Sequence, residues 1–355
     1  MIRLTKNICL LMMAVILSFS GYAQEMKTIK ANDKHFSFSG AYYIENTDQT
    51  VYFNRFDTKT LKNKETLMNP LKAYTQTGVS ISIASNSPQI IFHFTAREDT
   101  KNRAGILAVY KDGTLFKDIT LNPKKDLEPI IIKNPNGQQW TEWKVLLPLY
   151  YGLNFSGIDV LKESDLKNVE PEAKKVYVAI GNSITHGTGQ KASYQTYSYL
   201  LAEKKNWALY NLGVGGSKIS WPVADMLKDK KIDVMTILWG YNDWNAGYTL
   251  EDDIIPHYSK LLKILLKSHP NTKIYCILPT TTKRELPKKG DITIEQIRTA
   301  EANIIKELQN EGHKNLFIIK GYEITEVSDL KDQVHFSVEG AARFADKLNE
   351  IIQLD

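Results

Sequence analysis

The strongest constraint on the fold is a change of sequence pattern near residue 170. Beyond it, short apolar strand candidates alternate with longer amphipathic helix candidates. Alternating strands and helices form a parallel sheet that is covered by helices on both faces. The expected fold class of residues 175–355 is therefore α/β. The strand candidates are 175–181, 207–212, 233–239, 272–278 and 315–320, and the clearest helix candidates are 251–267, 293–311 and 338–352.

Residues 25–161 predict a different architecture. Segments such as HFSFSGAYYI, VSISIAS and QIIFHFTA are rich in β-branched and aromatic residues, and turns rich in Asn, Asp, Gly and Pro separate them. No amphipathic helix is obvious among these segments. The pattern is typical of an antiparallel β-sandwich or jelly roll. Residues 162–174 are polar, contain Pro171, and predict a linker.

The first residues have the composition of a secretory signal peptide. A basic start at 1–6 precedes an apolar run at 8–19, and small residues at 21–23 fit a cleavage site. The apolar run is too short for an ordinary membrane span, although a membrane-anchored N-terminus is the alternative. We therefore expect residues 1–23 to be removed and the protein to be exported, to the periplasm or the extracellular space.

Charge and cysteine content narrow the function classes. The formal net charge of +5 comes mostly from lysines scattered along the chain, so charge alone gives no reason to expect nucleic-acid binding. Removal of the signal peptide would leave Cys276, in the strand-like segment KIYCIL, as the single cysteine. The mature chain would then form no intramolecular disulfide and would depend on its core for stability.

A serine follows the first strand candidate of the second half. In VYVAIGNSITHG, residues 176–187, an apolar run stops at Gly181, and Ser183 comes before a helix-like stretch. Ligand sites in open parallel sheets form at the carboxyl ends of the strands. Ser183 is therefore either an ordinary helix cap or a nucleophile held at the edge of the sheet.

A serine nucleophile needs a base, a group that orients the base, and donors for the oxyanion. The segment DQVHF places Asp332 three residues before His335, a spacing that lets the carboxylate reach the imidazole. No other histidine has an acid at this spacing. His186 lies close to Ser183 but has no acid to orient it. We therefore expect His335 to be the base and Asp332 to orient it.

Two further strand ends supply candidate oxyanion donors. The segment YNLGVGGSK places Gly213, Gly215 and Gly216 after the second strand, and ILWGYNDW places Asn242 and Asp243 after the third. Each segment alone has a simpler interpretation, because glycines form turns and Asn-Asp pairs cap helices. Their combination with the serine and the Asp-x-x-His segment, in this order, is the specific signal.

The four segments together resemble the SGNH, or GDSL-like, hydrolases over residues 175–352. The resemblance rests on Gly181-Asn182-Ser183-Ile184, Gly216, Gly240-Tyr241-Asn242-Asp243, and Asp332 to His335. It implies a flavodoxin-like parallel sheet flanked by helices, with Ser183, His335 and Asp332 as the catalytic residues and Ser183, Gly216 and Asn242 as the oxyanion hole. We prefer Gly216 to Gly213 and Gly215 by its spacing from Asn211. The family commonly has Asp where this chain has Asn182.

The resemblance also implies ester hydrolysis through an acyl-enzyme, with no metal and no organic cofactor. A strand-rich first half before such a catalytic half resembles two-domain bacterial carbohydrate acetylesterases. Trp244, Tyr241 and Trp239 lie next to the third segment, and we expect them to bind sugar rings by stacking. The alternative interpretation places Trp239, like Trp221, in the core.

The sequence therefore predicts a secreted serine esterase that removes O-acetyl groups from a polysaccharide or oligosaccharide. The expected partner is the acetylated carbohydrate, with no nucleic acid and no membrane beyond the signal peptide. Another ester, such as a uronic acid methyl ester or O-acetylated sialic acid or peptidoglycan, and a non-catalytic carbohydrate-binding protein remain the alternatives. The basic loop 281–292 either borders the site, which would favour an acidic polysaccharide, or is simply solvated.

Overall fold

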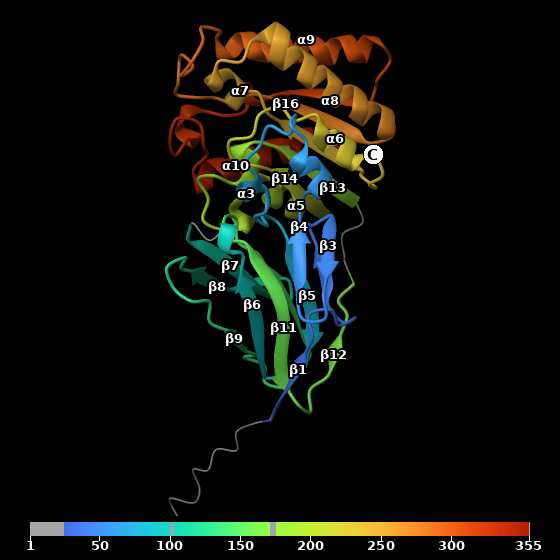
Figure 1. Cartoon of the computed structure of the whole chain (residues 1–355), viewed down its shortest axis with the longest axis vertical. Coiled ribbons are helices and arrows are strands. Elements are labelled where there is room, and N and C mark those ends of the chain that lie inside the picture. The colour runs from blue at the N-terminus through green and yellow to red at the C-terminus, as the bar shows by residue number, and fades with distance from the viewer. Residues whose placement is uncertain (1–24, 101–102, 171–174, 355) are drawn as a thin grey trace, which may run out of the picture.

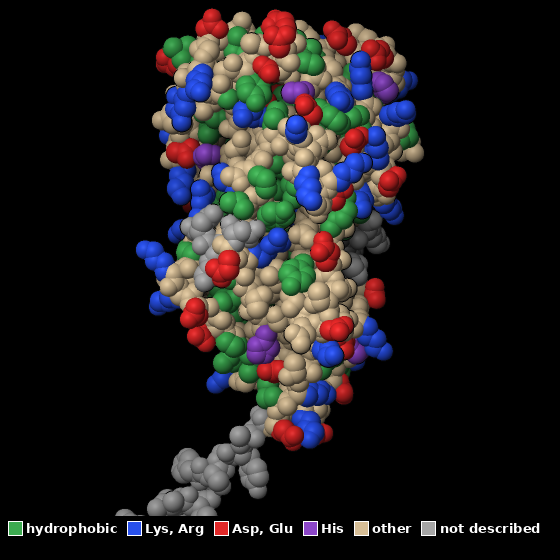
Figure 2. Space-filling view, in the orientation of Figure 1, with side chains coloured by type: hydrophobic (Ala, Val, Ile, Leu, Met, Phe, Trp, Pro, Cys, Tyr) green, Lys and Arg blue, Asp and Glu red, His purple; other side chains and the backbone are tan. Residues whose placement is uncertain are grey.

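The structure is a computed structural model that describes residues 25–100, 103–170 and 175–354. The predicted signal peptide, residues 1–23, lies outside the described residues. Figure 1 shows two parts stacked along the long axis, a β-sandwich below and a three-layered α/β part above. On the face in Figure 2, Lys and Arg side chains are interspersed with Asp and Glu side chains over both parts. None of the helices in the described ranges has the length and apolar character needed to span a bilayer.

The first half is built from two antiparallel sheets, as the sequence predicts. One has the order β3-β4-β11-β6-β9, with β1 added to β11, and the other has the order β12-β5-β10-β7-β8, with β2 added to β5. Their inward-facing residues form a separate hydrophobic core. The strands are β1 (Met26–Ile29), β2 (Ser37–Ser39), β3 (Tyr43–Asn46), β4 (Val51–Asn54), β5 (Ser80–Ser85), β6 (Gln89–Ala96), β7 (Gly105–Lys111), β8 (Thr114–Leu121), β9 (Ile130–Lys133), β10 (Thr141–Leu146), β11 (Leu153–Leu161) and β12 (Leu166–Lys167).

Two features of this half go beyond the sequence expectation. Strand β12 lies within the segment expected to be a linker, and it pairs with β5. Two helices of one turn each, α2 (Thr58–Lys62) and α3 (Pro70–Ala73), interrupt the strands and are capped by Asp57 and Asn69. They are too short to produce a helical periodicity, which is why the sequence pattern did not reveal them. The turn η2 (Glu98–Thr100) completes the helical elements of this half.

The second half has the predicted α/β fold. Its strands are parallel in the order β14-β13-β15-β16-β17, which places β13 between β14 and β15. Helices α5 and α10 pack together on one face, and α6, α8 and α9 cover the other (Figure 1). The strands are β13 (Lys175–Gly181), β14 (Trp207–Gly213), β15 (Val234–Leu238), β16 (Lys273–Leu278) and β17 (Leu316–Lys320).

The helices of this half agree with the predicted ones and add short elements between them. The three clearest predictions correspond to α8, α9 and α10, and a π-helical turn, η4 (Leu250–Ile254), precedes α8. The helices are α4 (Ser183–His186), α5 (Tyr197–Lys205), α6 (Pro222–Leu227), α7 (Tyr241–Ala246), α8 (Ile255–Ser268), α9 (Ile294–Asn310) and α10 (Val338–Ile351), with turns η3 (Ser193–Gln195), η5 (Gly321–Glu323) and η6 (Val327–Asp329).

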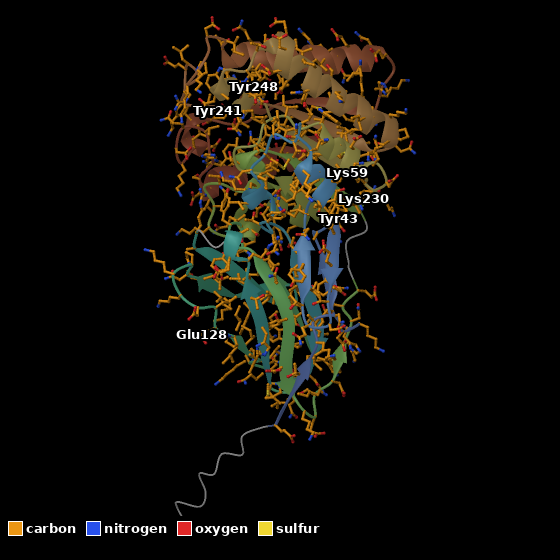
Figure 3. All side chains as sticks on the ribbon, in the orientation of Figure 1. Tyr43, Lys59, Glu128, Lys230, Tyr241 and Tyr248 are labelled. Atoms are coloured by element: carbon orange, nitrogen blue, oxygen red, sulfur yellow. The ribbon has the colours of Figure 1, made fainter. Side chains whose placement is uncertain are left out.

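The two halves share one hydrophobic cluster. Phe56, Tyr110 and Leu146 of the first half pack into the core of the α/β half. Figure 1 shows α3 reaching up to the level of α10 and α5. Figure 3 shows Lys230 of the α/β half beside Tyr43 of the sandwich, and the Lys230 Nζ lies 4.7 Å from the centre of that ring. Side chains of the first half therefore contribute to the core of the α/β half.

Arg55 is the main polar connection between the halves. Its side chain is buried, and its guanidinium donates to the carbonyls of Asn211 (2.8 Å) and Gly213 (2.7 Å) at the end of β14. It also donates to the carbonyls of Thr75 (2.6 Å) and Lys72 (3.1 Å) in its own half. Burial lowers the pKa of Arg55 to about 9, so the group keeps its charge at neutral pH. One cation thus satisfies backbone acceptors of both halves.

We predict that Arg55→Met lowers the free energy of unfolding by at least about 3 kcal/mol, because several buried carbonyls lose their donor together. Urea unfolding followed by circular dichroism measures the change. Lys117→Met, on the exposed strand β8, removes the same charge without touching the interface and serves as control. Equal stability of the two variants would contradict the role assigned to Arg55.

Candidate active site

Three side chains from two segments form a continuous hydrogen-bonded chain. Ser183 follows β13, and His335 and Asp332 lie in the loop before α10. His335 Nε2 is 2.8 Å from Ser183 Oγ, and His335 Nδ1 is 2.8 Å from Asp332 Oδ2. The structure thus brings together the three residues that the sequence singled out, across 152 residues of chain. This is the arrangement of a nucleophile, a base and an orienting acid.

The loop fixes the carboxylate of Asp332. Its Oδ1 accepts from the backbone N–H groups of Val334 (3.0 Å) and His335 (2.9 Å). Partial burial acts to raise the pKa of Asp332, but these two N–H groups and the imidazole outweigh it and hold the pKa below its usual range. The ionised carboxylate favours a proton on His335 Nδ1. His335 Nε2 is then free to accept a proton from Ser183.

The helix that begins at Ser183 is capped by a different residue from the one that the sequence offered. Asn182, not Ser183, is the N-cap of α4, because Asn182 Oδ1 accepts from Ile184 N–H at 3.0 Å. A Cβ atom at Gly181 would clash with Thr185 Oγ1 and the Leu238 carbonyl, so the tight turn requires glycine there. Ser183 is the first helical residue, whose N–H has no partner within the helix.

The glycine loop after β14 packs against the turn that carries this serine, because Val214 N–H donates to the Gly181 carbonyl at 3.0 Å. Gly213 N–H donates to Asn211 Oδ1 (2.8 Å) and Gly215 N–H donates to His186 Nδ1 (3.0 Å), so both are already engaged. Gly216, at a φ of 84°, is the exposed member of the three. Asn242 Nδ2 donates to the carbonyl of Ser217 (2.8 Å), which places this amide against the same loop.

The family of the second half follows from a sequence match over the segment that carries these residues. Residues 179–343 match the model of the GDSL-like Lipase/Acylhydrolase family. This part of the chain is a GDSL-like hydrolase domain. The match confirms the resemblance drawn from the four segments. No curated protein matches the chain by sequence.

Solved structures resemble both halves of the chain together. A salicylyl-acyltransferase, SsfX3, from a tetracycline biosynthetic pathway has a TM-score of 0.76 at 17% identity, over 90% of this chain and 95% of that one. A family two carbohydrate esterase from Clostridium thermocellum, in complex with cellohexaose, has 0.65 at 13%, over 85% and 98%. The acetyl xylan esterase Est2A from the rumen bacterium Butyrivibrio proteoclasticus has 0.62 at 13%, over 92% and 97%. At these identities the likeness shows the fold alone.

His186 has a structural place in the GDSL-like domain that the sequence did not reveal. It is fully buried, and because its Nδ1 accepts from Gly215 N–H, its proton is on Nε2. Nε2 is then a donor towards the Leu149 carbonyl (3.0 Å) and Thr75 Oγ1 (2.9 Å), both in the first half. Burial and the neighbouring Arg55 lower the pKa of His186 well below its usual range. A neutral His186 therefore holds the glycine loop and has no part in proton transfer.

The structure does not support sugar stacking by the aromatic residues around the third segment. Trp239 and Trp244 are fully buried, and their ring N–H groups donate to Ser217 Oγ (3.0 Å) and the Ile292 carbonyl (2.8 Å). Tyr241 is 7% exposed and packs edge-on against Trp244. All three rings belong to the hydrophobic core of the α/β half.

The basic loop 281–292 does border the site. Thr282 Oγ1 and Lys283 N–H both donate to the carbonyl of Gln333, at 2.9 Å each, and Gln333 lies between Asp332 and His335 in the chain. The loop thus packs directly against the segment that carries the base. A separate cleft of about 900 Å³ lies between the sandwich and α5, lined by Trp140, Lys144 and Glu203 among others, and Ser183 is not part of it.

Two buried acids lie under the turn that carries Asn242. Asp243 Oδ1 accepts from Ile219 N–H (3.1 Å), whereas Asp243 Oδ2 and both carboxyl oxygens of Glu301 have no hydrogen-bond partner among the described residues. Burial raises the pKa of Asp243 to about 7. Burial, and then Asp243, raise the pKa of Glu301, against the effect of Arg298. A Cβ atom at Gly240 would clash with Glu301, so this acid supports the turn directly.

These pKa values predict that the domain loses stability as the pH rises. The folded state holds the Asp243 proton up to about pH 7, while the unfolded chain releases it near 3.8. The stabilisation is therefore complete below pH 3.8 and is lost as the pH rises to about 7. We expect Asp243→Asn, which keeps the acceptor for Ile219, to reduce the fall in unfolding free energy between pH 5 and pH 8 by up to about 3 kcal/mol, at about 1.4 kcal/mol per pH unit between pH 5 and pH 7.

Urea titrations of both proteins at four pH values between 5 and 8 measure this difference. Asp48→Asn, in an exposed turn of the sandwich, is the matched control and should follow the unmodified protein. Parallel pH curves for Asp243→Asn and the unmodified protein would show that Asp243 does not bind its proton more tightly in the folded state.

Proposed function

We propose that the protein is an exported serine esterase that removes O-acetyl groups from a polysaccharide or oligosaccharide. The observation that carries the proposal is the hydrogen-bonded chain from Ser183 Oγ through His335 to Asp332. Gly216 lies in the loop that follows the neighbouring strand β14, and Asn242 donates to the same loop. The proposed export rests on the signal-peptide composition of residues 1–23.

In the first half-reaction, Ser183 Oγ attacks the carbonyl carbon of the ester while His335 Nε2 takes the hydroxyl proton. The imidazolium that forms is stabilised by the carboxylate of Asp332, 2.8 Å from Nδ1. The negative charge on the carbonyl oxygen is received by the N–H groups of Ser183 and Gly216 and by the Asn242 amide. Such preorganised donors stabilise the transition state more than the ground state.

Collapse of the tetrahedral intermediate breaks the bond between the acyl carbon and the sugar oxygen. His335 Nε2 returns its proton to that oxygen, and the sugar alcohol leaves with the acetyl group still on Ser183. A water molecule then attacks the acyl-enzyme, with His335 again as base, and releases acetate. No step in this sequence needs a group outside the chain and its substrates.

Structures with a similar fold support the proposal that the substrate is a carbohydrate. Two of the solved structures that cover nearly the whole chain are a carbohydrate esterase in complex with cellohexaose and an acetyl xylan esterase. An acyltransferase shares the same two-part fold, and transfer to another alcohol would differ from hydrolysis only in the group that attacks the acyl-enzyme. Hydrolysis is favoured because it requires no second organic substrate.

We predict that the protein hydrolyses 4-nitrophenyl acetate and that Ser183→Ala lowers kcat by at least about 10³-fold, because the acyl-enzyme cannot form. Release of 4-nitrophenolate measures the rate. Ser328→Ala, at an exposed position of η6 in the same half, controls for loss of a hydroxyl. Equal rates for Ser183→Ala and the unmodified protein would rule out Ser183 as nucleophile.

Acetylated xylan and acetylated pectin then test the substrate class. Release of acetate, blocked by Ser183→Ala, supports a glycan deacetylase. Release of methanol in place of acetate would identify a uronic acid methyl esterase, and acetyl transfer to an added alcohol without acetate release would identify an acyltransferase.

His186 gives a second kinetic prediction. We expect His186→Leu to lower kcat by roughly 10–100-fold with little change in KM, because Gly215 N–H loses its acceptor and the donor at Gly216 becomes less well oriented. His186→Asn keeps an acceptor oxygen near the position of Nδ1 and should recover part of kcat. The same kcat in both variants, at matched folded fractions, would contradict a positioning role.

A further inference from the structure

A lysine of the first half lies against the glycine loop of the active site. Lys72 is on α3, and a Cβ atom built on Gly216 would lie 3.8 Å from Lys72 Nζ. A Cβ atom built on Gly215 would lie 3.6 Å from the same nitrogen and 3.7 Å from Tyr150 Oη. The ammonium group therefore stands next to the residue whose N–H is the proposed oxyanion donor.

The backbone of Lys72 is held in place. Asn69 Oδ1 caps α3 by accepting from Leu71 N–H at 2.9 Å. The Lys72 carbonyl accepts from Arg55 (3.1 Å) and from Thr75 Oγ1 (2.7 Å). These contacts anchor the helix to the same network that holds β14. The backbone of α3 is thus held in one position, and it places the side chain of Lys72 against the glycine loop.

The ammonium group of Lys72 has no hydrogen-bond or ion-pair partner among the described residues. It is half-buried, and burial, together with the nearby Arg103, lowers its pKa. Arg103 itself lies over the ring of Tyr150, at 4.8 Å from the ring centre. A partly desolvated cation beside a second cation is unfavourable unless an anion completes the site.

A further cation, Lys331, lies near His335. Lys331 Nζ donates to the Gly189 carbonyl (3.4 Å), and a Cβ atom at Gly189 would lie 3.6 Å from the Cβ of His335. Asp332, the acid of the hydrogen-bonded chain, is already paired with His335. The surroundings of Ser183 therefore offer positive charge that no described acid neutralises.

We propose that Lys72 is a specificity-determining residue that binds a carboxylate of the substrate, and that the substrate is a glycan containing uronic acid. This inference rests on the proposed esterase function and refines it. A carboxylate beside the ester would give Lys72 a charge-assisted hydrogen bond, whereas a neutral glycan would cover the ammonium without neutralising it. The first half of the chain thereby contributes a substrate contact as well as support.

The test compares trigalacturonate with xylotriose as inhibitors of 4-nitrophenyl acetate hydrolysis. We expect the unmodified protein to bind trigalacturonate more tightly. Lys72→Met should raise the inhibition constant of trigalacturonate about 10–100-fold and leave that of xylotriose nearly unchanged. Lys72→Arg should keep most of the preference. Lys59→Met, exposed on α2 in the same segment and labelled in Figure 3, is the control of equal charge and should behave as the unmodified protein.

Two results would overturn the inference: no preference for trigalacturonate in the unmodified protein, or a preference that persists in Lys72→Met. Calorimetric titration of the same trisaccharides separates this failure from failure of the proposed function. If 4-nitrophenyl acetate is not hydrolysed but trigalacturonate binds through Lys72, the esterase proposal fails while the carboxylate site stands. Lys72→Gln, which also removes the charge but keeps a polar end, replaces Lys72→Met in the comparison if Lys72→Met does not fold.

Discussion

The hydrogen bond from Gly215 N–H to His186 Nδ1 is the contact on which the geometry of the site depends. It fixes the glycine loop against the short helix that begins with Ser183, so the proposed nucleophile and the proposed oxyanion donor are positioned by one imidazole. That imidazole is itself held by Leu149 and Thr75. The GDSL-like domain thus carries Ser183, His335 and Asp332, while the β-sandwich half supplies part of the framework around them.

The parts of the site that the sequence predicted are those determined by local chain geometry. Asp332 and His335 are three residues apart, and a short loop is sufficient to bring the carboxylate to the imidazole. Ser183 follows a wholly apolar strand, and in a parallel sheet the end of such a strand is the expected place for a functional residue. The order of strands and helices needed only hydrophobic periodicity.

The parts that the sequence did not predict depend on partners far away in the chain. In the sequence Arg55 does not differ from the other cations, because the carbonyls of Asn211 and Gly213 that accept its hydrogen bonds come close to it only in the folded chain. In the sequence Glu301 is one of several acids on a predicted helix. In the fold its carboxyl group faces Gly240 and has no hydrogen-bond partner among the described residues. The sequence predicted that Trp244 stacks on sugar rings, whereas the ring is buried. Composition near a motif does not tell which way a side chain points. Burial is a property of the whole fold.

The shared core has a consequence for the order in which the protein is synthesised and folded. Residues 55–77 are synthesised well before β14. The sandwich can therefore form before the strand that Arg55 contacts is present. During that interval Phe56 would be uncovered and the guanidinium of Arg55 would have only the acceptors of its own half. The sandwich would then act as a template on which the second half closes.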